Sequence, residues 1–175
     1  MRYVVVCLLK GETLRFHETL VSDVCTRFKV QRQKLPAHFT IKAPFEADNI
    51  EELEKVTKEF CNINYKTTIK IKGFNSFRNN VVFMDIFPSN EAVEVHDKYI
   101  DELQKLDWLS WKEHEGKNKK FHCTIVSRRI SSKFNEIWEY VNKFNPKFDL
   151  YFDNIAILIW KNGRWETYKE YKLGE

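Results

Sequence analysis

The chain alternates short apolar runs with longer segments in which apolar residues recur every three or four positions. Short apolar or alternating runs predict β-strands, and the three-to-four spacing predicts amphipathic helices. The expected strands span 4–9, 39–45, 67–74, 81–87, 121–127, 148–160 (as one or two strands) and 164–173. The expected helices span roughly 11–30, 50–61, 91–107 and 133–144. Because strands and helices interleave and a hairpin closes the chain, we expect an α+β fold.

The order of these elements repeats, first in residues 1–80 and again in residues 81–175. Each half begins with a valine-rich buried strand, continues with a long helix, and then has a strand that opens on a histidine. A shorter helix and a half-exposed strand follow. We therefore expect a single bilobal domain with a pseudo-twofold axis. Each lobe would be an antiparallel sheet with helices packed on its outer face, and a cleft would lie between the lobes.

Composition narrows the class of protein. Of 175 residues, 43% are hydrophobic and 31% charged, which is typical of a soluble globular protein and excludes disorder. The longest apolar run, Tyr3–Leu9, is too short to span a bilayer and lacks a signal-peptide cleavage site, so we expect a cytoplasmic protein with no membrane partner. No C-x-x-C pair occurs, which argues against a zinc ribbon or a thioredoxin-like site. The four scattered cysteines are expected to be buried and reduced: Cys7, Cys25, Cys61 and Cys123.

Charge and aromatic content permit an anionic, planar ligand. The 29 basic and 25 acidic residues give a formal charge of +4, a weaker excess than nucleic-acid-binding domains often show. This favours a small substrate over a long RNA footprint. Aromatic residues make up 15% of the chain, and most must fill the core. Phe77, Trp111 and Tyr168 are candidates for stacking on a base.

The strongest chemical signal stands at the third element of each half. Residues 38–41 read His-Phe-Thr-Ile, and residues 122–125 read His-Cys-Thr-Ile. Since side chains alternate along a strand, each histidine shares a face with the threonine two positions on, while the apolar residues take the other face. A pseudo-twofold axis would bring the two polar faces together across the cleft.

Two facing imidazoles suit the opening of a cyclic phosphodiester. One neutral ring would take a proton from water, and one imidazolium would protonate the leaving oxygen, each contributing roughly 10²–10⁴-fold. The threonine hydroxyls are suited to hydrogen-bond the non-bridging phosphate oxygens. No further cluster of histidines, cysteines or carboxylates accompanies either motif, so we expect no metal and no cofactor. Which histidine is the acid stays open.

With both motifs intact, the sequence resembles the two-histidine (2H) phosphoesterase superfamily, which includes the LigT-like 2′-5′ RNA ligases and cyclic phosphodiesterases. That family carries a pair of H-x-[T/S]-x motifs, one in each lobe. Residues 36–45 are also similar to the HxTLKxPF run that follows a proline in bacterial members. The resemblance implies that His38 and His122 are the catalytic acid/base pair, and that Thr40 and Thr124 bind phosphate. It further implies metal-free action on 2′,3′-cyclic or 2′-5′-linked phosphates.

Two cations are candidate substrate ligands. Some family members carry an arginine five residues after the second histidine, where this chain has Ser127, followed by Arg128 and Arg129. Strand alternation favours Arg128, and it likewise favours Lys42, because each lies an even number of residues from its motif histidine. Either could hold a phosphate. For both, the alternative is a solvated charge at a strand end.

We therefore predict a metal-independent, monomeric phosphoesterase that hydrolyses the 2′,3′-cyclic phosphate of an RNA end or a small cyclic nucleotide. Three alternatives remain: a 2′-5′ RNA ligase, an RNA 3′-exonuclease using the same cleft, and a non-catalytic module that binds RNA ends or nucleotides. The polar segment 110–120 is expected to be a long mobile loop. Its lysine run directly precedes the second motif and is a candidate lid over an anionic substrate.

Overall fold

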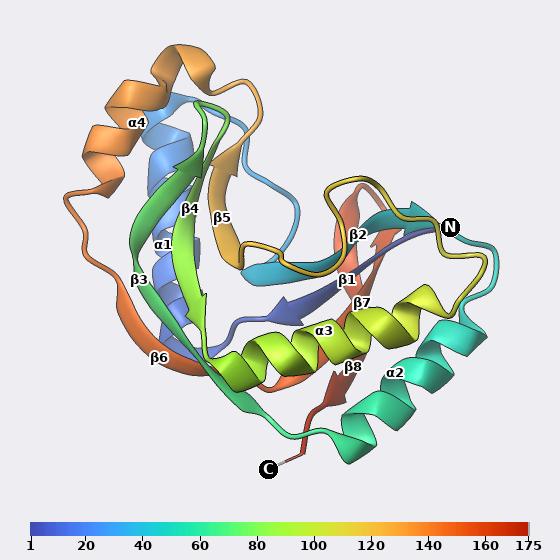
Figure 1. Cartoon of the computed structure of the whole chain (residues 1–175). Helices are drawn as coiled ribbons and strands as arrows, with labels where there is room; N and C mark the ends of the chain where they lie inside the picture. The colour runs from blue at the N-terminus through green and yellow to red at the C-terminus, as the bar shows by residue number, and fades with distance from the viewer. Residues whose placement is uncertain (175) are drawn as a thin grey trace.

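Two antiparallel four-stranded sheets and four α-helices make up the computed structural model, which describes residues 1–174 (Figure 1). The first sheet has the order β2-β1-β7-β8, formed by β1 (Arg2–Leu8), β2 (His38–Glu46), β7 (Asn154–Lys161) and β8 (Arg164–Lys172). The second has the order β5-β4-β3-β6, formed by β3 (Thr67–Phe77), β4 (Val81–Pro88), β5 (His122–Ser127) and β6 (Lys147–Phe152). This bilobal α+β architecture confirms the predicted fold class.

The helices cover both sheets. They are α1 (Gly11–Phe28), α2 (Glu51–Ile63), α3 (Asn90–Gln104) and α4 (Phe134–Val141). Helix α1 packs on β5, α2 packs on β7 and β8, and α3 packs on β3 and β4. The predicted helix at 133–144 is shorter than expected, because α4 ends at Val141 and a turn follows, in which the Phe144 N–H donates to the Val141 carbonyl at 3.0 Å. A 3₁₀ turn at Ser131–Lys133 precedes the helix, and the Ser131 hydroxyl donates to Asn80 Oδ1 at 3.0 Å. No helix within residues 1–174 is long and apolar enough to cross a membrane.

The sheets do not follow the two halves of the sequence. Strand β3 comes from the first half but joins β4, β5 and β6, and the β7–β8 hairpin comes from the second half but joins β1 and β2. One large hydrophobic core contains residues from both sheets and from all four helices. Each lobe is therefore built by both halves of the chain, and the sequence repeat describes the order of the elements rather than a boundary between lobes.

Strand β1 is buried on both faces, which explains its continuous apolar run. Val5 and Cys7 face the large core. Val4 and Val6 face a second, smaller cluster that includes Leu158 of β7. All four cysteines are free, and three of them are buried. Apolar burial on two sides therefore holds β1 and its neighbour β2 in place, and β2 carries the first histidine motif.

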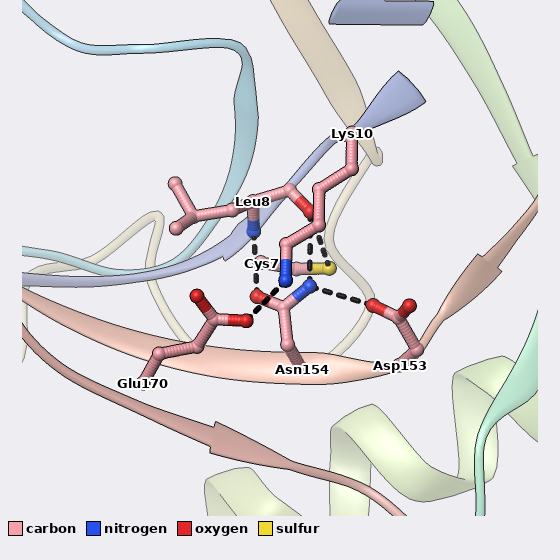
Figure 2. A network of polar contacts seen from close by, with 6 residues as sticks. All are labelled: Cys7, Leu8, Lys10, Asp153, Asn154 and Glu170. Atoms are coloured by element: carbon pink, nitrogen blue, oxygen red, sulfur yellow. Dashed lines mark hydrogen bonds and ion pairs between the residues drawn. The ribbon is translucent and has the colours of Figure 1, made fainter. Parts of the chain in front are cut away.

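A buried asparagine closes the end of the first sheet beside that motif (Figure 2). Leu8 pairs with His38 of β2 on one side. On its other side, the Leu8 backbone N–H donates to Asn154 Oδ1, and the Leu8 carbonyl accepts from Asn154 Nδ2, both at 2.9 Å. Asn154 Nδ2 also donates to Asp153 Oδ1 at 2.6 Å. The side-chain amide thus satisfies backbone groups that β7 would otherwise pair, and it fixes the residue opposite His38.

Candidate active site

The two motif strands meet at the centre of the molecule. Strand β2 is the edge of the first sheet and β5 is the edge of the second, and they lie side by side where the sheets adjoin (Figure 1). A positive charge on His122 acts to lower the pKa of His38, so the two rings are close enough to interact electrostatically. The fold therefore brings together the two histidines that the sequence pairs by pattern.

Each histidine ring is held by the backbone two residues before it. His38 Nδ1–H donates to the Pro36 carbonyl at 2.6 Å, and His122 Nδ1–H donates to the Lys120 carbonyl at 2.9 Å. Because a carbonyl oxygen only accepts, the bonded nitrogen of each ring carries the proton. In the neutral ring Nε2 then keeps its lone pair, and in the protonated ring Nε2–H becomes a donor. Both rings are thus oriented to exchange a proton at Nε2.

The first motif strand bulges directly after its threonine. Thr40 pairs with Val6 of β1, whereas Lys42 pairs with the adjacent Val5. Two residues of β2 thus advance against one of β1, and Ile41 is the extra residue. A bulge of this kind turns the following side chains to the opposite face of the sheet.

The second motif strand repeats this irregularity at the equivalent place. Thr124 pairs with Phe83 of β4, whereas Val126 pairs with the adjacent Val82, so Ile125 is the extra residue. The duplication thus extends beyond the motif residues to the local distortion of the backbone.

The bulge makes the prediction that Lys42 shares a face with His38 wrong. Lys42 follows Val5 toward the large core and is 1% exposed. Its Nζ lies 2.5 Å from Glu115 Oε2, in an ion pair whose side chains are almost completely buried, and 5.0 Å from the centre of the Trp111 ring. The Lys42 ammonium group is therefore engaged by the loop between α3 and β5 instead of facing the cleft.

Strand alternation also fails for Arg128. Strand β5 ends at Ser127, and Arg128 has a φ of 65°, in the left-handed region. Its side chain is exposed and lines a pocket of about 330 Å³ together with Ser127. Arg128 thus lies in the turn after the strand rather than on the face of His122.

Ion pairs anchor the lysine run that precedes the second motif. Lys117 pairs with Asp101 of α3 at 2.5 Å, and Lys120 pairs with the buried Asp85 of β4 at 2.5 Å. Together with the Lys42–Glu115 pair, these contacts attach the loop to both sheets and to α3. Among residues 1–174, Lys119 alone of the run's three lysines has no carboxylate within ion-pair distance. The segment predicted to be a mobile loop is thus anchored at several points.

Lys119 is a residue of the site that sequence analysis does not single out. Its side chain is partly buried, and burial lowers its pKa to about 8. Its positive charge acts to lower the pKa of both His38 and His122, so it lies near both rings. The only sequence signal for it is its place in a lysine run three residues before the second motif.

The two histidines have different surroundings. His38 is 5% exposed, and burial lowers its pKa to about 4. His122 is half-buried, with the rings of Phe77 and Phe83 at 4.9 and 5.1 Å from its own. Burial also lowers the pKa of His122, but the negative charge of Asp85, its pairing partner in β4, acts in the opposite direction.

Of the three aromatic residues considered for stacking, the structure places one at this site. Phe77 lies edge-on to His122 and lines a pocket of about 630 Å³ together with His122 and loop residues between 113 and 120. Trp111 lies beneath the Lys42 ammonium group. Tyr168 packs against Tyr3 on the first sheet, away from the motifs.

The carbonyl of Thr124 receives two side-chain donors. His17 Nε2–H of α1 donates to it at 2.9 Å, and Gln33 Nε2 donates to it at 2.5 Å. The His17 side chain is itself buried. The bulge after Thr124 interrupts the strand ladder at this point, so side chains satisfy the carbonyl. Both donors thereby fix the second motif strand from outside its own sheet.

Sequence comparison relates the chain to one family model and to several bacterial proteins. It matches the family model described as "2'-5' RNA ligase superfamily" over residues 12–164. It is 27% identical over 150 residues to a Bacillus pumilus (strain SAFR-032) protein named "Putative phosphoesterase", with 81% of each chain covered. It is 25% identical over 149 residues to "Putative phosphoesterase GK0864" of Geobacillus kaustophilus, with 80% of each chain covered.

Structural comparison finds the same fold in distant proteins. TT0787 of Thermus thermophilus superposes with a TM-score of 0.68 at 13% identity, covering 100% of both chains. E. coli LigT complexed with 3′-AMP superposes with a TM-score of 0.63 at 15% identity, covering 99% of this chain and 98% of LigT. Since the family match spans most of the sequence, the chain belongs to the 2′-5′ RNA ligase superfamily, the two-histidine phosphoesterases that its paired motifs resemble.

Proposed function

We propose that this protein is a metal-independent phosphoesterase that hydrolyses the 2′,3′-cyclic phosphate of RNA ends or small nucleotides. The observation that carries the proposal is the matched orientation of two histidines on neighbouring edge strands, each with Nδ1 bound to a carbonyl and Nε2 left for proton transfer. The likeness to LigT, which was crystallised with 3′-AMP, lends support, because a nucleoside monophosphate is the kind of product this reaction yields.

Because His38 and His122 have different surroundings, each is suited to a different proton transfer. With a pKa of about 4, His38 is neutral at pH 7 and has a free Nε2 lone pair, so it is the general base. Burial and the charges of Lys119 and Lys120 lower the pKa of His122, but it is more exposed than His38 and the negative charge of Asp85 opposes the shift, so His122 is the general acid.

The reaction balances with these two residues. Water attacks the phosphorus of the cyclic phosphate while its proton passes to Nε2 of His38. The bond from phosphorus to one ribose oxygen breaks, and Nε2–H of His122 delivers a proton to that oxygen. The product is a phosphate monoester, and the two rings then return to their starting states by proton exchange with water.

The remaining groups of the site stabilise the negative charge. Thr40 and Thr124 share the faces of the two histidines and donate hydrogen bonds to the non-bridging phosphate oxygens. Lys119, with a pKa of about 8, is protonated at pH 7 and supplies a positive charge beside both rings. Because its side chain is partly buried, this charge is weakly screened by solvent.

A substrate panel tests this function. The protein is incubated with 2′,3′-cyclic nucleotides, 3′,5′-cyclic nucleotides, 2′-5′-linked dinucleotides, and RNA bearing a 2′,3′-cyclic phosphate with or without a 5′-hydroxyl partner. Products are identified by mass spectrometry, with and without EDTA, and His122→Ala serves as the control for contaminating enzymes. Monoester formation that resists EDTA and disappears in the variant supports the proposal. RNA joining alone, or binding without any turnover, contradicts it.

A further inference from the structure

A second pocket lies at the end of β5 opposite to His122. Its volume is about 330 Å³, which is within the range of small-ligand sites. It lies between the end of β5, the segment 31–35 that follows α1, and the β7–β8 hairpin. Six of its lining residues carry the argument: Arg2, Arg32, Lys34, Arg128, Trp160 and Trp165.

The pocket concentrates positive charge. Four of its lining residues are basic, and no lining residue among the described positions 1–174 is acidic. None of these four cations forms an ion pair with another described residue. The whole chain has a formal charge of only +4, so its positive excess is unevenly distributed. An uncompensated group of cations of this kind attracts phosphate groups.

The pocket also offers aromatic surface. The rings of Trp160 and Trp165 are half-buried, with centroids 5.5 Å apart and planes inclined at 68°. The Arg2 guanidinium lies 5.7 Å from the Trp165 ring, and Lys34 Nζ lies 5.1 Å from the Trp160 ring. Cations interleaved with aromatic rings are what single-stranded nucleic acids require, since the cations bind phosphates and the rings stack on bases.

The segment 31–35 connects this pocket to the histidines. Gln33 donates to the Thr124 carbonyl, and Leu35 packs on the small apolar cluster that contains Val6, the residue paired with Thr40. His122 pairs with Asp85 and Ser127 pairs with Val81, four positions apart on β4, which corresponds to about 13 Å along a strand. That distance exceeds the reach of one nucleotide and suits a short oligonucleotide.

We propose that this pocket binds a nucleotide of single-stranded RNA whose cyclic 3′-terminal phosphate lies between the two histidines. This rests on the proposed function and makes an RNA end, rather than a free mononucleotide, the preferred substrate. The phosphate backbone contacts the basic side chains, and the base stacks on the hairpin tryptophans.

Binding to a double variant tests the pocket separately from catalysis. Arg32→Gln/Lys34→Gln removes two exposed cations of the pocket, and Arg15→Gln/Lys98→Gln removes two exposed cations on helices α1 and α3 as a matched control. Each pair is placed in the His122→Ala background to prevent turnover. The probe is a labelled single-stranded RNA with a 3′-phosphate, and its Kd is measured across a range of salt concentrations.

The pocket variant is expected to bind this RNA about tenfold more weakly than the control variant. Its slope of log affinity against log salt should be smaller by about 1.4, since each phosphate contact in a single strand contributes about 0.7. Equal affinity and equal slope in the two variants would overturn the proposal that the pocket binds RNA. An equal loss of affinity for 3′-AMP would also overturn it, because a mononucleotide at the histidines does not reach this pocket.

The two proposals can fail independently. Pocket-dependent RNA binding by a protein that turns over no cyclic phosphate supports the pocket and refutes the hydrolase. Hydrolysis of cyclic mononucleotides and RNA ends with the same kcat/KM, unchanged in Arg32→Gln/Lys34→Gln, supports the hydrolase and refutes the pocket.

Discussion

The two motif strands have the same local backbone geometry, but the residues around them differ. In β2 and in β5, the histidine ring is bound to the carbonyl two residues earlier, and the strand bulges after the threonine. The histidine of β2 is deeply buried opposite Leu8, whereas that of β5 is half-buried opposite Asp85. The repeated backbone thus places two equivalent imidazoles, and their neighbours differ: burial keeps His38 neutral down to about pH 4, whereas the charge of Asp85 favours the protonated form of His122.

The position after each bulge shows a second difference. Lys42 of β2 and Val126 of β5 are equivalent, and both turn away from the cleft and are buried. Valine is compatible with an apolar environment without a partner, whereas the lysine requires the buried carboxylate of Glu115. The first strand therefore uses this position to hold the loop that carries Lys119, and the second strand uses it only for packing.

The largest expected effect comes from removing either histidine. His38→Ala and His122→Ala should each lower kcat/KM by roughly 10²–10⁴-fold, because each removes one proton transfer. Their residual pH–rate profiles should differ. His38→Ala should lose the acid limb near pH 4, and His122→Ala should lose the alkaline limb, which lies below the ordinary histidine pKa of 6.5.

Kinetics across pH 3–9 check this prediction, and thermal unfolding verifies that each variant is folded. Loss of the same limb in both variants would contradict the division of roles.

A stability experiment tests the role of the buried ion pair that Lys42 forms after the first bulge. Lys42→Met should lower the free energy of unfolding by about 3–5 kcal/mol, because it leaves Glu115 buried without a counter-charge. Lys42→Met/Glu115→Gln should recover part of that loss. Lys70→Met is the matched control, since Lys70 pairs with Asp149 at the exposed surface and should cost about 0–1 kcal/mol.

Urea unfolding measures all three variants. If Lys42→Met were no more destabilising than Lys70→Met, the ion pair could not be what anchors the loop.

Some features of this fold can be predicted from the sequence pattern, and others cannot. Element types follow from local periodicity, and the histidine pair follows from the repeat, because both signals lie within short stretches of chain. The exchange of β3 and the β7–β8 hairpin between sheets depends on which strands pair, and element order does not encode that pairing. The fold class was therefore predictable, whereas the composition of each lobe was not.

The residues of the candidate site likewise fall into predictable and unpredictable ones. His38 and Thr40 share a face because the strand is regular between them, but Lys42 lies beyond a bulge that apolar alternation does not reveal. Lys119 depends on contacts that its loop makes with three distant elements. Residues within a regular strand could be predicted, and those placed by a distortion or by long-range ion pairs could not.

A smaller effect is expected from substituting the two threonines, and it tests whether both motif strands bind the phosphate. Thr40→Val and Thr124→Val keep the side-chain shape and remove one hydroxyl donor each. If both hydroxyls contact the charged phosphate, each substitution should cost about 1.5–3 kcal/mol, or roughly 10–100-fold in kcat/KM. Kinetics with a 2′,3′-cyclic nucleotide measure the two losses. A loss confined to one variant would show that only one strand binds the phosphate.

The smallest effect is expected for Asp85→Asn. This substitution tests most directly whether His38 and His122 have different roles. The negative charge of Asp85 favours protonated His122 and so raises its pKa against the effect of burial. Its removal should lower the pKa of His122 further, so the acid form is lost at a lower pH and the alkaline limb moves down. The acid limb, set by His38, should stay near pH 4.

Asp149→Asn removes an exposed carboxylate of β6 and should move neither limb, so it controls for the change in net charge. The Asn75 amide donates to Asp85 Oδ2 at 3.2 Å, and a substituted asparagine can accept the same bond through its own oxygen. The substitution also removes the carboxylate partner of Lys120, so Lys120→Gln is a second control that separates loss of the loop anchor from loss of the charge beside His122. If the acid limb moved instead, Asp85 would be acting on the base, and His122 and His38 would have the opposite roles.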